Sequence, residues 1–114
     1  MAYEIEVYET DLGKKPFDDW LKELSDAQAR HIIRARLVRA RAGNLGNCKT
    51  LGNGINEMKI DFGPGYRIYF AKTGKALVLL MCGGSKRTQA KDIQKAVAYL
   101  SDYKKRGTKK YAKK

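Results

Sequence analysis

The segment from residue 55 to 82 constrains the fold most, because it contains three strand-like runs separated by very short turns. The runs are INEMKIDF (55–62), YRIYFAK (66–72) and KALVLLMC (75–82), joined by GPG and TG. Glycine accepts the backbone angles of tight reversals, so the pattern predicts an antiparallel meander. The third run is apolar at nearly every position, which predicts a strand inside the sheet.

Upstream of the meander, the sequence predicts one strand and a helical hairpin. YEIEVYE (3–9) alternates apolar with polar side chains, which is typical of an edge or near-edge strand with one solvent-exposed face. A helix is expected to begin near Pro16, whose fixed φ suits a first turn, and its apolar residues recur at helical spacing. A second helix is expected to begin with Ser25 or Asp26 as its N-cap and to end at Gly43.

A loop, a last helix and a basic tail account for the rest of the chain. Residues 43–54 are rich in glycine and asparagine and are expected to be loop. Helical spacing returns from 88 to about 105. The prediction is one α+β domain, residues 1–103, of order βααβββα, with helices on one face of a mostly antiparallel sheet and the other face open. Residues 104–114 are expected to be a basic tail, with a frayed helix end followed by disordered chain.

Charge is distributed unevenly along this chain, whose net charge is +12 at pH 7. The first 26 residues hold eight acids and three lysines, whereas the rest hold four acids and 21 lysines and arginines. This asymmetry favours a polyanionic partner, above all nucleic acid, because neutralising phosphates releases condensed counterions. The alternative is a basic protein without such a partner. Charge alone does not separate RNA from DNA.

Two cations are predicted to meet on one face of the meander. Along 55–62 and 66–72 the apolar side chains share a face, which leaves Lys59 and Arg67 together on the other. Register parity brings these two side chains to within about 5–8 Å at Cβ. Such like charges destabilise a sheet unless an anion lies between them. The alternative is pairing with nearby acids, for which the candidates are Glu57, Asp61 and Asp92.

Further side chains could extend this site. The segment GGSKRT after the third strand could bring Lys86 or Arg87 over the same face, and Tyr69 and Tyr66 could stack on RNA bases. A row of arginines on the second predicted helix could contact phosphates or simply be solvated: Arg30, Arg34 and Arg41.

Metal-binding and membrane proteins are disfavoured. Cys48 and Cys82 lack zinc-type spacing, and His31 is the single histidine, so no metal or cofactor is expected. No apolar run approaches the roughly 18 residues that cross a bilayer, and the N-terminus lacks the features of a signal peptide. We therefore expect a cytoplasmic protein that does not bind membranes.

Two motifs resemble those of a known family. GPGYRIYF (63–70) and LMCGGSKRTQAKDI (80–93) are similar to the paired motifs of the RelE/ParE toxin superfamily, specifically its HigB-like, phage-derived addiction module killer branch. The resemblance extends over residues 3–103 and implies that family's βααβββα fold. It also implies the toxin of a bacterial type II toxin–antitoxin system, inhibited by a cognate antitoxin, often a helix-turn-helix protein of the HigA kind. Relatives of this branch cut mRNA in the A site of the 70S ribosome without metal.

The resemblance further implies roles for individual residues. Lys59, Arg67, Lys86 and Arg87 stand where RNA-cleaving relatives carry basic catalytic residues. The RNA 2′-hydroxyl would attack its own phosphodiester and leave a 2′,3′-cyclic phosphate. Arg67 would hold the phosphate and Lys59 could act as the base. Lys86 or Arg87 would assist the leaving 5′-oxygen.

The chain departs from the family pattern near its last predicted catalytic arginine, and two rival functions are compatible with the same sequence. Several RelE-like toxins carry a tyrosine after the last catalytic arginine, whereas this chain offers Asp92 or Gln89. The first rival is a ParE-like, gyrase-inhibiting toxin on the same scaffold, against which the cation cluster argues. The second is a non-catalytic basic RNA-binding module, which would be harmless when expressed alone.

Overall fold

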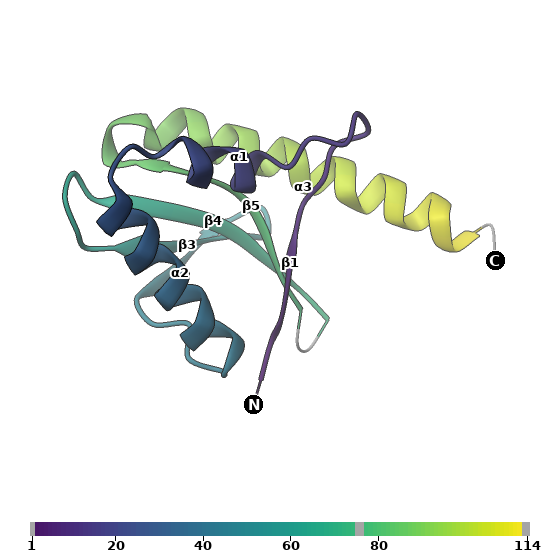
Figure 1. Cartoon of the computed structure of the whole chain (residues 1–114). Coiled ribbons are helices and arrows are strands. Elements are labelled where there is room, and N and C mark those ends of the chain that lie inside the picture. The colour runs from purple at the N-terminus through teal and green to yellow at the C-terminus, as the bar shows by residue number, and fades with distance from the viewer. Residues whose placement is uncertain (1, 75–76, 113–114) are drawn as a thin grey trace.

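The predicted meander lies at the centre of the sheet (Figure 1). The computed structural model describes residues 2–74 and 77–112, with side chains as far as Arg106. Three antiparallel strands form this centre: β3 (Ile55–Ile60), β4 (Tyr66–Thr73) and β5 (Leu77–Ser85). The last of these has a strand on each side, which confirms the interior position that its apolar sequence predicts.

Two outer strands complete the sheet order β1-β5-β4-β3-β2. β1 (Glu4–Val7) pairs in parallel with β5 and is the predicted edge strand. β2 (Cys48–Gly52) pairs antiparallel with β3, so the prediction that 43–54 is entirely loop is wrong. Asn53 and Gly54 join β2 to β3 with φ values of 54° and 79°, as a tight hairpin requires. The observed order is therefore βααββββα, one strand more than predicted.

The helical hairpin covers the first face of the sheet, as predicted. α1 (Pro16–Glu23) begins at the expected proline. α2 (Ala27–Arg41) is capped by Asp26, whose carboxylate accepts two backbone N–H groups of the first turn. Gly43 follows with a φ of 105°, the left-handed conformation that ends helices. The largest fully buried side chains of this face are Phe17, Ile33, Met58, Ile68, Phe70 and Leu80.

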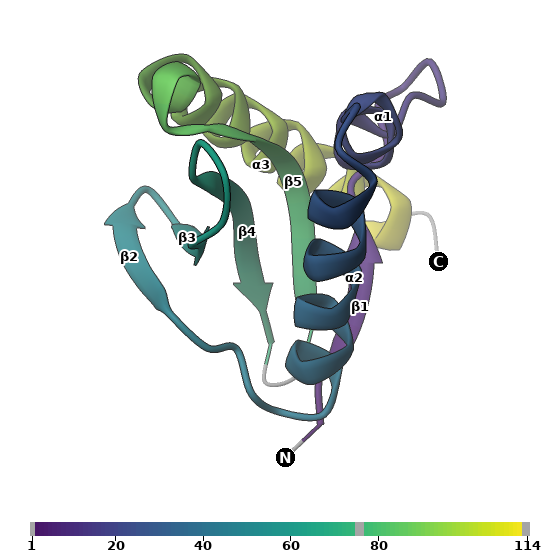
Figure 2. The same cartoon turned by 60° about the vertical axis from the view of Figure 1, so that its left-hand side comes forward.

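The C-terminal helix covers much of the second face, where the sequence analysis expected open sheet. A single 3-10 turn, η1 (Lys86–Thr88), leads from β5 into α3 (Gln89–Ala112). On α3, Ala96 and Leu100 are buried, and they pack on apolar side chains of the second face: Ile55, Tyr69, Leu79 and Met81. The expectation of an uncovered face is therefore wrong. Turned by 60°, Figure 2 shows β5 between α1 and α3.

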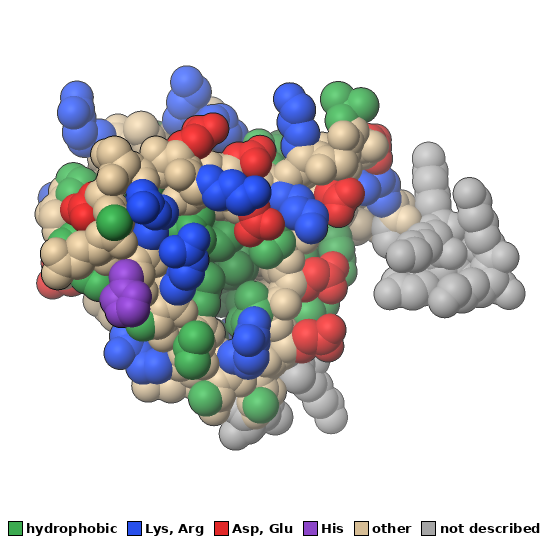
Figure 3. Space-filling model, in the orientation of Figure 1, with side chains coloured by type: hydrophobic (Ala, Val, Ile, Leu, Met, Phe, Trp, Pro, Cys, Tyr) green, Lys and Arg blue, Asp and Glu red, His purple; other side chains and the backbone are tan. Residues whose placement is uncertain are grey.

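The helix α3 also extends further than predicted, through residues 104–112 of the expected tail, while 113 and 114 lie outside the described residues. By contrast, the first face is incompletely covered. Figure 3 shows hydrophobic side chains at the floor of a hollow between α2 and β1. Half-buried side chains at the margin of the first-face core include Ile5, Val7 and Leu37.

Candidate nucleic-acid site

The predicted pair of cations meets in the predicted register. Lys59 on β3 lies directly opposite Arg67 on β4. Their neighbours Met58 and Ile68 belong to the first-face core, so both cations lie on the second face. Lys59 is exposed, whereas Arg67 is only 8% exposed. The site therefore contains one solvated and one buried cation.

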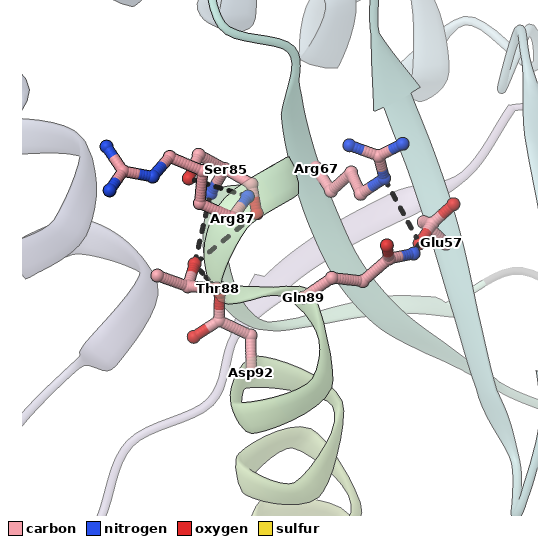
Figure 4. A network of polar contacts seen from close by, with 7 residues as sticks. All are labelled: Glu57, Arg67, Ser85, Arg87, Thr88, Gln89 and Asp92. Atoms are coloured by element: carbon pink, nitrogen blue, oxygen red, sulfur yellow. Dashed lines mark hydrogen bonds and ion pairs between the residues drawn. The ribbon is translucent and has the colours of Figure 1, made fainter.

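A buried carboxylate accompanies Arg67. Glu57 is 3% exposed, and its Oε2 lies 3.5 Å from the Nε of Arg67. Gln89, the first residue of α3, donates from its side-chain Nε2 to the same oxygen at 2.7 Å. Figure 4 shows this chain of contacts from α3 across Glu57 to Arg67. The alternative that Arg67 pairs with Glu57 is therefore realised.

This pairing leaves the guanidinium of Arg67 incompletely bonded. Its Nε and Nη1 atoms are buried, and neither makes a hydrogen bond within the described part of the chain. A buried donor without an acceptor costs about 1–3 kcal/mol, and more if it is charged. In Figure 4 the terminal nitrogens of Arg67 point away from α3. An anion that accepts from these donors would recover that free energy.

A third cation, which the sequence analysis missed, lies on the same face. Lys49 on β2 is directly opposite Glu57 and is exposed. A pocket of about 240 Å³ lies over β2, β3 and β4. It is lined by Asn47, Cys48, Lys49, Glu57, Lys59 and Arg67. Three cations against one carboxylate make this pocket suitable for a phosphate. The Asn-Gly turn after β2 is the sequence signal that could have revealed this strand.

A buried arginine of α2 holds the rim of the pocket. Arg36 donates to the backbone oxygens of Lys59 at 2.7 Å, and of Leu45 and Asn47 at 3.2 Å each. The backbone N–H of Lys59 in turn donates to the oxygen of Asn47 at 3.0 Å. A Cβ on Gly46 would lie 2.6 Å from the guanidinium, so this glycine permits the close approach. Arg36 therefore ties two segments of the pocket to the helix.

The predicted catalytic pair after β5 lies outside the pocket. Lys86 and Arg87 are exposed in η1, where the backbone N–H of Lys86 donates to the oxygen of Gly65 at 2.9 Å. Ser85 caps this turn by accepting from the backbone N–H of Arg87. Figure 4 shows the Arg87 side chain pointing away from Arg67. Neither residue of the pair is among those that line the pocket.

Asp92 is also held away from the pocket. It is 7% exposed and accepts a short hydrogen bond from the Thr88 hydroxyl. Its carboxylate lies so close to Gly84 that a Cβ there would be 1.8 Å from Oδ2. Asp92 therefore packs over the backbone of β5 and does not reach Arg67 as an ion-pair partner within the described residues.

The two tyrosines predicted to stack on bases are both buried. Tyr69 is 0% exposed beneath α3, and burial raises the pKa of its hydroxyl. Tyr66 is 8% exposed on the opposite face, where its ring meets Trp20 edge-on at 6.2 Å. Neither tyrosine offers a free ring to a base in the pocket, so the stacking prediction has no support in this geometry.

The three arginines predicted on α2 belong to the first-face side of the molecule. Arg30 donates to the backbone oxygen of Leu24 and so closes the turn between α1 and α2. Arg34 and Arg41 are exposed. Because α2 packs on the first face, these side chains do not join the pocket residues.

The cysteines add no reactive group to the site. Cys48 and Cys82 are free thiols. Burial raises the pKa of Cys48 and brings that of Cys82 to about 12, so both are protonated at neutral pH. Over residues 2–74 and 77–112, no three His, Cys, Asp or Glu side chains gather as metal ligands, and no helix has the length and apolar character of a membrane span.

Comparison with known proteins points to a phage-related group. Residues 19–101 match the family model described as Phage derived protein Gp49-like. A protein of Haemophilus influenzae, named only as an uncharacterized protein, is 46% identical over 80 residues. This alignment covers 70% of the chain and 81% of the Haemophilus protein.

Proposed function

Because the chain belongs to the Gp49-like family of phage-derived proteins, which is a RelE-type family of addiction-module toxins, we propose that it is the toxin of a bacterial type II toxin–antitoxin system. We propose further that it is a metal-independent endoribonuclease that cuts mRNA on the 70S ribosome and so inhibits translation. The observation that carries this proposal is the buried guanidinium of Arg67, in which Nε and Nη1 make no hydrogen bond within the described residues, beside two further cations. The protein partner of this toxin would be a cognate helix-turn-helix antitoxin.

In the proposed reaction the RNA supplies its own nucleophile. The 2′-hydroxyl oxygen bonds to the adjacent phosphorus, and the bond from phosphorus to the 5′-oxygen breaks. The products are a 2′,3′-cyclic phosphate and a free 5′-hydroxyl. Arg67 would donate from Nη1, which makes no hydrogen bond within the described residues, to the phosphate and stabilise the pentacoordinate transition state.

Glu57 would act as the general base and Lys59 as the general acid of this reaction. A carboxylate is a base at neutral pH, whereas a lysine must first lose its own proton. In this proposal Glu57 therefore takes the 2′-hydroxyl proton, a role that the sequence analysis gave to Lys59. The ammonium group of Lys59, exposed across the pocket, gives a proton to the leaving 5′-oxygen.

The remaining cations would bind RNA phosphates without taking part in the cleavage reaction. Lys49 adds charge at the edge of the pocket. Lys86, Arg87 and the exposed arginines Arg34 and Arg41 are suited to backbone phosphates of ribosomal RNA, which would orient the mRNA. Cleavage without the ribosome should be weak, because free RNA is seldom held in the geometry for in-line attack.

Induced expression tests the proposal directly. Lys59→Ala should abolish growth arrest while the circular dichroism spectrum stays unchanged, because Lys59 is exposed. Arg67→Ala should do the same but also lower stability, since it leaves Glu57 buried without its cation. Lys72→Ala is the matched control, because Lys72 is exposed at the other end of β4.

Three other outcomes of this experiment would contradict the proposal. Arrest that persists in folded Lys59→Ala would refute the assigned site. Arrest by the wild type with intact mRNA and a DNA-damage response would favour the gyrase-inhibiting rival. Harmless expression of the wild type without any antitoxin would favour a non-catalytic RNA-binding module.

A further inference from the structure

Gln89 lies in the site without a role in the proposed reaction. It is the first residue of α3, and its half-buried side chain donates from Nε2 to Oε2 of Glu57 at 2.7 Å. Because α3 follows β5 in the chain and β4 lies between β5 and β3, this side chain crosses the strand of Arg67 to reach Glu57. Figure 4 shows Gln89 extending from the start of α3 toward Glu57. The contact therefore links the last helix to the buried carboxylate of the pocket.

The ion pair between Glu57 and Arg67 is longer than such pairs usually are. Oε2 of Glu57 lies 3.5 Å from Nε of Arg67, which makes no hydrogen bond within the described residues. A carboxylate and a guanidinium that bond directly approach to about 2.7–2.9 Å, often through two parallel hydrogen bonds. Here the short hydrogen bond of the carboxylate goes to the neutral amide of Gln89 instead.

The backbone would allow Glu57 and Arg67 to approach each other more closely. Glu57 lies opposite Tyr69 in the register of β3 and β4, and Arg67 precedes Tyr69 by two residues, so the two charged side chains are diagonal neighbours on one face. Diagonal neighbours are about 7–8 Å apart, which is within reach of long side chains. The distance between the two charged groups is therefore set by their side-chain partners rather than by the strands.

Gln89 is suited to hold the carboxylate in place. Its backbone is fixed, because Ser85 caps the preceding turn by accepting from the N–H of Arg87 and because α3 packs on the sheet through Ala96. Only the amide nitrogen can face Glu57, since the carboxylate would repel the amide oxygen. Glu57 is 3% exposed, so water competes little for this hydrogen bond, and hydrogen bonds to charged groups are stronger than those between neutral groups.

From these contacts we infer that Gln89 is a positioning residue, which holds the Glu57 carboxylate off the guanidinium of Arg67 and so keeps the donors of Arg67 available to a phosphate. Without Gln89, the carboxylate would close on Arg67 and compete with the RNA phosphate for the same donors. The inference rests on the proposed function only in taking an RNA phosphate as the ligand of Arg67, and it does not depend on cleavage.

A double-mutant cycle at positions 57 and 89 tests this role. Binding of a fluorescent, non-cleavable 2′-deoxy analogue of RNA to the full chain is measured by anisotropy. Gln89→Met keeps the length of the side chain but removes its donor, and the analogue should bind about tenfold more weakly. In the Glu57→Gln background, which has no competing carboxylate, the same substitution should change the affinity by less than about twofold. Gln94→Met, at an exposed position of α3, is the matched control and should leave the affinity unchanged.

The NMR signal of the Nε proton of Arg67 provides a second readout that requires no RNA. In Gln89→Met this proton should move downfield, because it gains a hydrogen bond to the Glu57 carboxylate. The signal should stay in place in Gln94→Met. A residue that merely stabilised α3 would not produce this shift.

The outcomes of the cycle separate this inference from the proposed cleavage. An equal loss of affinity with either residue at position 57 would mean that Gln89 only stabilises α3, and would overturn the inference. An unchanged Arg67 signal in Gln89→Met, or an absence of saturable analogue binding by the wild type, would overturn it as well. If the cycle shows the expected coupling but the wild type cuts no mRNA, the proposed chemistry fails and the positioning role stands.

Discussion

At the scale of single residues, Arg67 is the centre of the candidate site. Its guanidinium is buried beside Glu57, yet its Nε and Nη1 atoms make no hydrogen bond in the described structure. A structural ion pair would be expected to satisfy more of these groups, since buried charges are costly when incompletely bonded. The arrangement is therefore better suited to receive an anion than to stabilise the sheet.

Glu57→Gln distinguishes the proposed proton acceptor from a merely structural partner. Without the carboxylate, cleavage should fall at least about 100-fold, the usual contribution of a general base. Binding of a non-cleavable 2′-deoxy analogue should stay equal or become tighter, because Arg67 no longer has Glu57 as a competing anion. Asp61→Asn, at an exposed acid just after β3, is the matched control. Full cleavage by Glu57→Gln would instead favour Lys59 as the base.

Arg36→Met tests whether the rim of the pocket is positioned from α2. The variant removes three part-buried hydrogen bonds from a charged donor to backbone carbonyl groups, so the free energy of unfolding should fall by about 3 kcal/mol. RNA affinity should fall by about tenfold even well below the unfolding temperature, because Lys59 is no longer held. Arg39→Met changes an exposed arginine of the same helix to which no RNA contact is assigned, and it should alter neither quantity. Unchanged RNA affinity in folded Arg36→Met would contradict the positioning role.

Some of this site could be read from the sequence. Strand parity alone placed Lys59 opposite Arg67, because both strands have one apolar face. It could not show that Glu57 rather than solvent meets Arg67, since that depends on side-chain conformation. Nor could it show that Tyr69 is covered, because the position of a distant helix decides this.

At the scale of elements, β2 and α3 account for the differences between prediction and structure. The glycine-rich composition of 43–54 concealed β2, although Asn53-Gly54 is a strong hairpin signal. The apolar stripe of the last helix was recognised, but a stripe does not specify which sheet face it covers. The apolar residues of the second face, such as Leu79 and Met81, required such a cover.

A polar cluster fastens the far part of α3 to the end of β1. The hydroxyl of Tyr8 donates to Asp102 at 2.5 Å, and Arg106 donates to the same carboxylate from Nε at 2.9 Å. Burial and the bond to Asp102 raise the pKa of Tyr8 from 10.0 to about 12. Hydrogen bonds from Tyr8 and then Arg106 lower the pKa of Asp102.

These shifts predict how stability depends on pH. A phenol whose pKa is raised on folding stabilises the protein below about pH 10, and this contribution is lost as the pH rises toward 12. The lowered pKa of Asp102 gives a contribution present above about pH 4 and lost in stronger acid. In urea unfolding, Tyr8→Phe should be less stable at pH 7 and should lose less stability between pH 10 and 12. Tyr3→Phe is the control, and identical alkaline profiles for wild type and Tyr8→Phe would contradict the prediction.

At the scale of the whole molecule, charge divides the surface into regions of different chemistry. The acidic first 26 residues supply β1 and α1, whereas the basic remainder supplies the pocket. Figure 3 shows lysine and arginine side chains scattered over the visible face rather than gathered in one patch. General basicity therefore favours attraction to RNA, while the local groups around Arg67 would determine the chemistry.

The chemical ends of the RNA fragments test the central claim most directly. Purified protein is incubated with programmed ribosomes, and the ends of the cut mRNA are analysed for wild type and Lys59→Ala. We expect a 2′,3′-cyclic phosphate on one fragment and a 5′-hydroxyl on the other, with neither produced by the variant. Fragments that end in 3′-hydroxyl and 5′-phosphate, or equal cleavage by Lys59→Ala, would contradict it.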